Sequence, residues 1–272
     1  MRDLLFTLRR LPEQRVDLSS LVPENLQGLV EKAIARLPIH TTSEKLCCGD
    51  LFKIRKGNPW SLRFEGGSDR FDFIGAGMTQ GDITVMGSAG QQAGRLMRGG
   101  RVHIGGDAGP YAASRMSAGR LEIDGDAGNG LGGPLAGEMA GMAGGVVIVR
   151  GNAGSRAGDR LRRGLIVVEG RSGIEAGCRM LAGTLVLRGH VAGAPGMLMR
   201  RGTIIASDEN CPILPTFIDC GPHRLVAARL LAAEIERLGL AWAGKLKRSL
   251  RRFMGDMATL GMGEIFVVSP SK

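Results

Sequence analysis

Glycine recurs at a fixed interval through the middle of the chain, and this periodicity limits the possible folds more than any other feature of the sequence. Six segments share one pattern: an apolar residue, a variable residue, a second apolar residue, another variable residue and then glycine. These closing glycines are Gly87, Gly106, Gly125, Gly151, Gly170 and Gly189. They are 19 residues apart, except that seven extra residues lengthen the interval between Gly125 and Gly151 to 26. Such self-similarity predicts a repeat architecture.

Two further columns keep the same register. Nine residues before each closing position stand Met78, Met97, Met116, Met142, Leu161, Met180 and Met199. Six residues before it stand Gly81, Gly100, Gly119, Gly145, Gly164, Gly183 and Gly202. Because Leu161 takes a methionine place without breaking the pattern, we expect stacked core side chains rather than thioether ligands for a soft metal.

Each repeat contains one short strand of period two followed by turns. A single strand of this kind cannot bury its apolar face, but copies stacked at about 4.8 Å can. The sequence therefore predicts an all-β core, a right-handed single-stranded β-helix of about 19 residues per coil. We expect an N-terminal cap over 1–45, the β-helix over 46–210 and a C-terminal helical extension over 211–272.

The ends of the stack need caps, because bare strand edges would polymerise. Apolar spacing within 19–39 predicts a helix in the N-terminal extension, and a second helix is expected over about 223–238. A basic stretch, "GKLKRSLRRFM" (244–254), follows with apolar residues on one side. Its Lys245, Arg248 and Arg252 are expected either to be solvated or to dock against an acidic neighbour.

The middle residue of each strand faces outward and changes character along the stack. It reads Thr84, His103, Glu122, Ile148, Val167, Val186 and Ile205. An apolar stripe rarely stays exposed to water. We therefore expect the last four residues to form an interface, covered by a partner subunit or by the C-terminal helix.

Charged residues near the closing glycines also recur. Asp124, Arg150, Glu169 and Arg188 alternate in sign on neighbouring coils and predict a cross-strand ladder that controls register. Asp107 and Asp126 each follow a closing glycine, and we expect them to cap corner amides rather than to act as an acid/base pair.

The net charge of +10 indicates an anionic partner or a soluble basic surface. The five cysteines form no CxxC pair, and no signal peptide or membrane span is evident, so we expect a reduced, cytoplasmic protein. No motif combines a nucleophile, a base and an oxyanion site. We predict no catalytic residue and no metal site, and interpret the chain as a rigid scaffold or interaction module.

Three segments carry a resemblance to a known family: "IGAGMTQGDITVMGSAG" (74–90), "AGEMAGMAGGVVIVRGNAG" (136–154) and "ILPTF" (213–217), with the lead-in "LPIHTTSEKLCCGDLFKI" (37–54). Over roughly 35–220 the chain resembles the C subunit of formylmethanofuran dehydrogenase. Its β-helix resembles the C-terminal domain of glutamate synthase at the level of the fold. The excess of arginine over lysine favours the bacterial version of the assembly, the formyltransferase/hydrolase complex, over the archaeal tungsten or molybdenum dehydrogenase that reduces CO2.

The resemblance implies a non-catalytic subunit that joins hydrolase-like (A), dehydrogenase-like (B) and formyltransferase (D) subunits in tetrahydromethanopterin-dependent one-carbon metabolism. It also implies a methanofuran- or methylofuran-type cofactor in the complex, which this chain itself does not bind tightly. The cofactor's polyglutamyl tail is anionic, and arginine suits contacts to carboxylates. We expect Arg95, Arg98, Arg162, Arg163, Arg200 and Arg201, at the turns of the coils, to guide it.

Two other classes of function remain open. A stand-alone β-helix enzyme, such as a carbohydrate lyase, would need Asp, Arg or Lys clustered on one outward face, and aromatic-poor faces disfavour sugar stacking. A nucleic-acid binder fits the charge, but one Tyr, two Trp and eight Phe offer little for base stacking.

Overall fold

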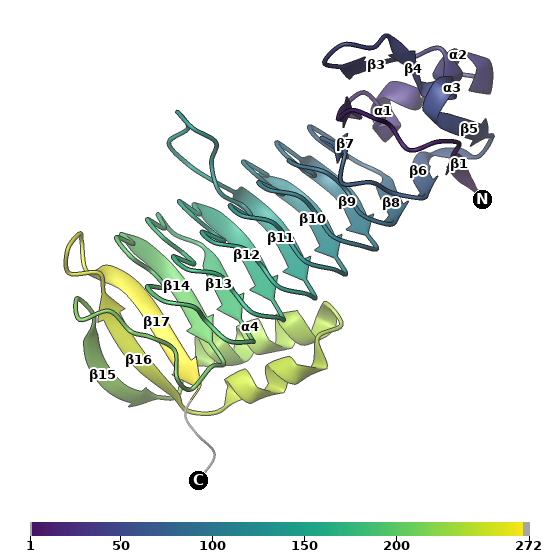
Figure 1. Cartoon of the computed structure of the whole chain (residues 1–272). Coiled ribbons are helices and arrows are strands. Elements are labelled where there is room, and N and C mark those ends of the chain that lie inside the picture. Colours follow the sequence, from purple (N-terminus) through teal and green to yellow (C-terminus); the bar gives the residue numbers. More distant parts are fainter. Residues whose placement is uncertain (1, 269–272) are drawn as a thin grey trace.

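The structure, a computed structural model, describes residues 2–268. Figure 1 shows an elongated stack of coils with a small N-terminal lobe at one end, the strands β15, β16 and β17 at the other, and helix α4 along the lower side. Thirteen strands form one sheet in the order β15-β16-β17-β14-β13-β12-β11-β10-β9-β8-β6-β1-β5, and four short strands form a second sheet in the order β4-β3-β2-β7. The predicted mostly-β core with few helices is confirmed.

The large sheet contains β1 (Asp3–Leu8), β5 (Phe52–Arg55), β6 (Asn58–Glu65), β8 (Asp82–Met86), β9 (Arg98–Ile104), β10 (Ala118–Ile123), β11 (Ala143–Val149), β12 (Arg163–Val168), β13 (Thr184–Leu187), β14 (Arg201–Ala206), β15 (Ile218–His223), β16 (Leu250–Gly255) and β17 (Met262–Val268). The small sheet contains β2 (Val16–Asp17), β3 (Pro38–Thr41), β4 (Leu46–Cys47) and β7 (Phe71–Asp72). The helices are α1 (Pro23–Leu26), α2 (Glu31–Ala35), α3 (Cys48–Leu51), α4 (Val226–Arg237) and the 3₁₀ helix η1 (Ala241–Lys247).

The periodic strands pair in parallel with the register that the sequence predicts. The first apolar residue of each repeat is paired with its equivalent in the next, in the series Ile83, Val102, Leu121, Val147, Ile166, Leu185 and Ile204. A second parallel ladder of single bridges joins Ala89, Ala108, Ala127, Ala153, Ser172 and Val191. Each coil therefore hydrogen-bonds to the next on two sides, and the side chains between the two ladders form a continuous core.

The methionine column lies in that core, as predicted. All seven members, including Leu161, are fully buried. The second glycine column has positive φ at each corner. From Gly100 onward, the methionine-column side chain of the preceding coil, which is leucine beside Gly183, fills the space next to the glycine. At Gly119, φ is +93°, and a Cβ would stand 2.8 Å from both the Met97 Cε and the Gly100 carbonyl oxygen. The two columns thus recur together because glycine leaves room for methionine.

The N-terminal extension differs from the predicted helical cap. Only the short α1 and α2 are helical, because Gly28 between them adopts a left-handed φ of +77°, and Val30 is exposed. β1 instead enters the large sheet between β5 and β6, where the Phe6 ring stacks on Phe64 with centroids 4.7 Å apart. The sheet thus crosses the boundary expected at residue 46. Its last strand, β5, carries Lys53 and Arg55, charges that discourage edge-to-edge pairing.

The C-terminal extension is partly helical. α4 lies within the predicted range of 223–238, but the basic stretch 244–254 is not one amphipathic helix: η1 ends at Lys247 and β16 begins at Leu250. After β15, α4, η1 and β16 the chain rejoins the stack. β17 pairs in parallel with β14, so that Ile265 continues the inward column of Ile204. Phe253 and Met254 therefore belong to a strand of the sheet, and the alternation of a strand replaces the helical spacing.

The apolar outward stripe is covered by the chain itself. A second core buries the four residues of this stripe, Ile148, Val167, Val186 and Ile205. They pack against apolar side chains of α4, η1, β16 and β17, among them Ala232, Ile235 and Leu246. The sequence left two possible covers for this stripe, a partner subunit or the C-terminal helix, and the structure shows the helix. These four side chains are therefore not available to a partner subunit.

A buried carboxylate marks the end of this cover. Glu122, in the same outward column, is 4% exposed and forms ion pairs with Arg101 at 2.6 Å and Arg120 at 2.9 Å. Arg120 also donates a hydrogen bond to the carbonyl of Leu238, just past the end of α4. A guanidinium at a helix C-terminus complements the helix dipole. This cluster lies where α4 ends and where the outward column becomes polar.

The covered stripe predicts a position-dependent response to charge. Val186→Asp should lower the free energy of unfolding by about 3 kcal/mol or more, because it buries an unpaired carboxylate beneath α4. Thr84→Asp, in the same column of an early coil that α4 does not reach, should change it by less than about 1 kcal/mol. Urea unfolding followed by circular dichroism measures both, and equal losses would contradict the cover.

We expect the methionine column to tolerate a change in side-chain shape but not a loss of side-chain volume. Met116→Leu should cost less than about 1.5 kcal/mol of unfolding free energy, since leucine already occupies this column at position 161. Met116→Ala should cost about 2–5 kcal/mol because it opens a cavity in the closed interior. The same unfolding experiment compares the two, and a leucine variant as unstable as the alanine variant would refute this view of the column.

Candidate interaction surfaces

One edge of the stack carries the charge ladder that the sequence predicts. Arg150 forms ion pairs with Asp124 at 3.2 Å and with Glu169 at 3.4 Å, and Glu169 pairs with Arg188 at 3.0 Å. His103 extends the ladder, since its Nε2 lies 2.8 Å from Asp124. These pairs are partly exposed to solvent, and each contributes little energy. Their regular alternation fixes neighbouring coils in register, and Arg188 ends the row over the ring of Trp242, 5.4 Å from its centroid.

The corners after the closing glycines are capped by side chains, as expected for Asp107 and Asp126. The N–H of Asp126 donates to Asp107 at 2.7 Å, and the N–H of Asn152 donates to Asp126 at 2.7 Å. Ser88 and Asn152 extend the row in the same way, accepting from the N–H groups of Asp107 and Arg171. Each carboxylate or amide thus satisfies a corner amide of the next coil, which is a structural role.

Five of the six arginines predicted to guide the cofactor tail are exposed along one corner. The N–H groups of Arg98, Arg162 and Arg200 each donate to the carbonyl of the methionine-column residue next to them in the stack, at Met78, Met142 and Met180. Arg163 and Arg201 follow directly, and all five side chains are exposed. Within residues 2–268 none of these guanidinium groups has an acidic partner. Unpaired charges of one sign in a row create a field that attracts an anion.

Arg95 does not belong to this row. Its guanidinium forms an ion pair with Glu138 at 2.6 Å, and both side chains are only 16% exposed. Glu138 also pairs with Arg115 at 3.5 Å. Because its charge is neutralised and largely buried, Arg95 has a structural function that the sequence did not reveal.

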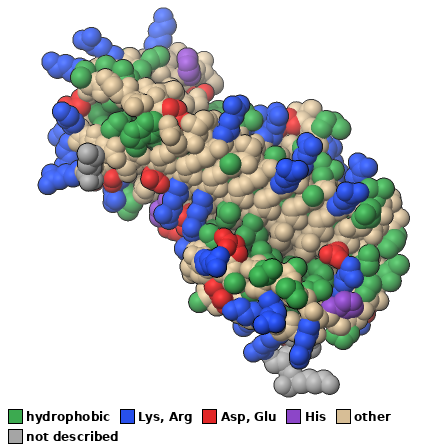
Figure 2. Space-filling view, turned by 180° about the vertical axis from the view of Figure 1, so that it is seen from behind, with side chains coloured by type: hydrophobic (Ala, Val, Ile, Leu, Met, Phe, Trp, Pro, Cys, Tyr) green, Lys and Arg blue, Asp and Glu red, His purple; other side chains and the backbone are tan. Residues whose placement is uncertain are grey.

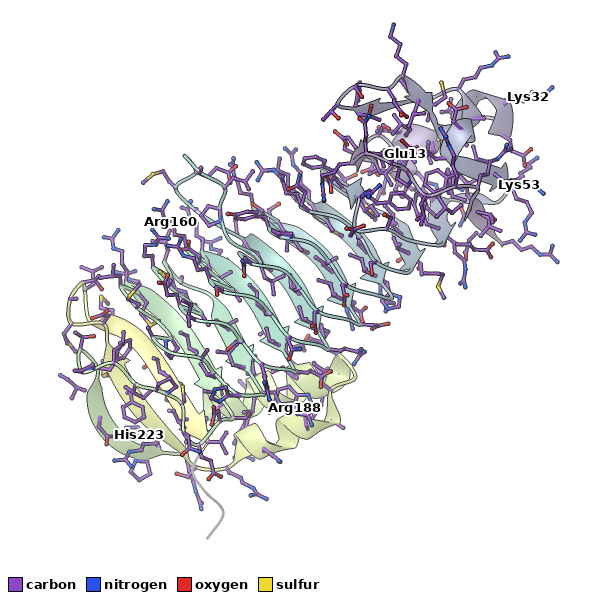
Figure 3. All side chains as sticks on the ribbon, viewed as in Figure 1. Glu13, Lys32, Lys53, Arg160, Arg188 and His223 are labelled. Carbon is purple, nitrogen blue, oxygen red and sulfur yellow. The ribbon has the colours of Figure 1, made fainter. Side chains whose placement is uncertain are left out.

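Glu138 belongs to the loop formed by the seven extra residues, which projects from the upper edge of the stack in Figure 1. Burial raises the pKa of Glu138, but hydrogen bonds from Arg95 and the Leu135 N–H, with the charges of Arg95 and Arg115, hold it below its usual value. Arg160, on this upper edge in Figure 3, donates to the Glu138 carbonyl at 2.7 Å. The loop is therefore firmly attached while the neighbouring Met139 is 80% exposed. The lengthened repeat was the only signal of this loop in the sequence.

The three basic residues predicted to form an interface do not share one face. Lys245 and Arg248 line a small cleft with Arg188 and Trp242, near η1. Arg252 is on β16 and forms an ion pair with Glu264 on β17. The break between η1 and β16 separates them, so the expected basic helix face is absent from the described structure.

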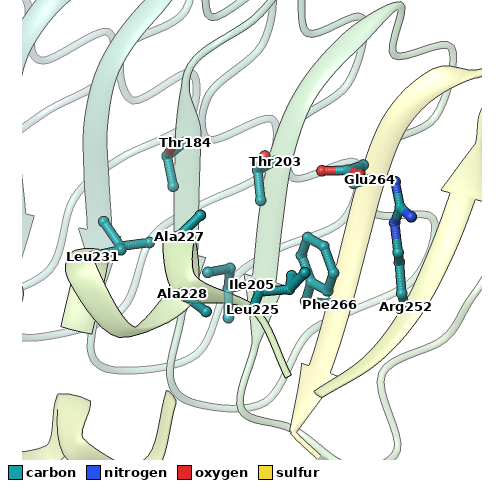
Figure 4. A pocket seen from close by; sticks show the side chains of 10 residues that line it. All are labelled: Thr184, Thr203, Ile205, Leu225, Ala227, Ala228, Leu231, Arg252, Glu264 and Phe266. Carbon is teal, nitrogen blue, oxygen red and sulfur yellow. Dashed lines mark hydrogen bonds and ion pairs between the residues drawn. The ribbon is translucent and has the colours of Figure 1, made fainter. Parts of the chain in front are cut away.

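A groove of about 300 Å³ opens between the first turns of α4 and the strands β13, β14 and β17 (Figure 4). Ile205 and Phe266 are among its apolar residues, and Thr184 and Thr203 contribute hydroxyl groups. The Arg252–Glu264 pair lies at one end, so the groove has little net charge. Val226 and Leu230, also on α4, do not line the groove and are exposed to solvent.

Residues 2–268 contain no group of three His, Cys, Asp or Glu side chains placed to hold a metal ion. Burial raises the pKa values of the Cys48 and Cys211 thiols to about 12, so both remain protonated at neutral pH. None of the helices in the described part of the chain has the length and apolarity to cross a bilayer.

No family model matches the chain. It is 48% identical over 257 residues to the C subunit of the formyltransferase/hydrolase complex Fhc of Methylorubrum extorquens, covering 94% of this chain and 96% of that protein. Its structure matches a chain in the crystal structure of the M. extorquens formyltransferase/hydrolase complex (FhcABCD) with methylofuran, with a TM-score of 0.92, 42% identity and coverage of 98% and 100%.

These matches span almost the whole of each chain and include the C-terminal region that lies outside the resembling segments. They confirm the resemblance drawn from the glycine-rich repeats and favour the bacterial assembly over the archaeal one. The chain belongs to the family formed by the C subunits of formyltransferase/hydrolase complexes.

Proposed function

We propose that this protein is the non-catalytic C subunit of a formyltransferase/hydrolase complex in tetrahydromethanopterin-dependent one-carbon metabolism. The observation that carries the proposal is the match over nearly the full length of both chains to a subunit of that complex. The expected partners are the hydrolase-like, dehydrogenase-like and formyltransferase subunits, with a methylofuran-type cofactor in the assembly. The cytoplasmic location expected from the sequence is part of the same proposal.

The architecture supports a scaffold. We propose that the stacked coils form a right-handed, single-stranded β-helix, a form consistent with the parallel pairing of coil to coil and the two ladders. Backbone hydrogen bonds join each coil to the next, and capped corners and the ion-pair ladder add links between the middle coils, so that the stack resists bending. A rigid rod of this kind can hold catalytic subunits at a fixed separation.

We also propose that the exposed arginine row guides the cofactor's anionic tail. Arg98, Arg162, Arg163, Arg200 and Arg201 lie along one corner, and two coils separate Arg162 from Arg200, which is about 10 Å at strand spacing. Guanidinium groups bind carboxylates through charge-assisted hydrogen bonds. A flexible polycarboxylate could move from one such group to the next without being held tightly at any of them.

Affinity purification of the tagged chain from its own host tests both proposals. The wild-type chain should co-purify with hydrolase-like and formyltransferase subunits identified by mass spectrometry; their absence would refute the scaffold function. The triple variant Arg98→Glu, Arg162→Glu and Arg163→Glu should retain all subunits but transfer formyl groups at least about threefold more slowly at low salt, because reversed charges repel the tail.

The matched control reverses charges far from the row. Lys32, Lys53 and Arg55 are in the N-terminal lobe, where Figure 3 labels the first two. Their change to Glu alters the net charge by the same amount. The control should transfer formyl groups at the wild-type rate. A triple variant as fast as the wild type, or a control equally slow, would count against the arginine path.

A further inference from the structure

The loop between β16 and β17 and the last turn of the coils together expose four large apolar side chains. Leu198, Met257, Leu260 and Met262 are each between 41% and 54% exposed. They are neighbours: Met262 is the register partner of Arg201, and Leu198 is hydrogen-bonded to the loop through Asp256. Figure 2 shows hydrophobic side chains gathered at this end of the stack, on the right edge of the view. We call these four residues the end patch.

The end patch is held in a fixed conformation. Asp256 is 2% exposed, and its carboxylate accepts hydrogen bonds of 2.8 Å from the N–H groups of Leu198 and Ala258. The Thr259 hydroxyl donates to the Met199 carbonyl at 2.6 Å, and the Met257 N–H donates to the Thr216 carbonyl. The loop is thus fastened to the coil beneath it. A surface ordered in advance loses less conformational entropy on binding.

Nothing in the described chain covers these side chains, in contrast to the apolar stripe beneath α4. Clustered exposed hydrophobic residues on a soluble protein mark an interaction site, and methionine suits contact surfaces because its side chain adapts. The exposed Arg200 and Arg201 border the patch without an acidic partner in residues 2–268. The patch is therefore an apolar centre with positive charge on one side.

We propose that the end patch docks another subunit of the complex, one that presents an apolar anchor flanked by carboxylates. This inference rests on the proposed function and adds the surface at which one partner binds. The charge argues against a second copy of this chain, because a symmetric contact centred on the patch would bring two Arg200–Arg201 pairs together. Arg200 and Arg201 are also the last residues of the exposed arginine row. The docked subunit therefore lies at the end of the path proposed for the cofactor's tail.

The test is purification of the tagged complex from its own host with the double variant Met257→Asp and Leu260→Asp. Both side chains are half-exposed, so the variant should keep the wild-type thermal midpoint. It should retain less than about a tenth of the wild-type amount of one identified subunit, because charges placed in an apolar contact remove its central anchor. The control, Leu11→Asp with Met86→Asp, changes two exposed apolar residues elsewhere and should keep every subunit.

Four results would overturn the inference. The first is wild-type stoichiometry of every subunit in the double variant, and the second is a thermal midpoint lowered as much as that of Val186→Asp. The third is a self-associating wild-type chain that becomes monomeric in the variant by light scattering. The fourth is wild-type binding to phosphatidylglycerol vesicles that the variant loses. Failure of the proposed function differs from all four, because the wild-type chain itself would then purify without the other subunits.

Discussion

The structure depends on backbone hydrogen bonding between one coil and the next. A single coil has one short strand and cannot bury an apolar face, so each coil is stable only when its neighbours are in place. Because the strands pair in parallel with the same offset, every inward position repeats as a column. The methionine, aliphatic and glycine columns are therefore consequences of one register.

The same register organises the surface. Where a column faces outward, its chemistry decides what lies against it: Val167 and Val186 are under α4, whereas Glu122 holds two arginines at the limit of that helix. Where it faces a corner, residues such as Asp126 cap amides of the next coil. Scaffold and binding surface are thus built from one repeat, and their difference arises from single substitutions along a column.

The periodic part of the chain could be predicted because its signal is repeated. The stacked methionines, the Asp124–Arg150–Glu169–Arg188 ladder and the cover of Ile148 follow from residue identity and spacing alone. The N-terminal lobe could not be predicted in this way, since the pairing of β1 with β6 links residues nearly sixty positions apart without any repeat. For the same reason the spacing of Leu246, Leu250 and Phe253 suggested a helix where the chain changes to a strand.

The binding surfaces were predicted less completely than the fold. Spacing placed Arg98, Arg162 and Arg200 on one corner, but it did not show that Glu138, in the inserted loop, neutralises Arg95. The end patch depends on the C-terminal hairpin returning to the stack. That contact joins Asp256 to Leu198 across 58 residues, and no local pattern reports it.

Removal of one coil tests the register most directly. Deletion of residues 88–106 removes one 19-residue repeat and joins Gly87 to Asp107 at the equivalent corner. We predict a folded protein with an unchanged circular dichroism spectrum per residue and a cooperative thermal transition. Deletion of 88–109, three residues longer, leaves a coil too short to reach the next and should prevent folding. Equal stability of the two deletion proteins, or loss of structure in both, would contradict the claim that a 19-residue register holds the molecule together.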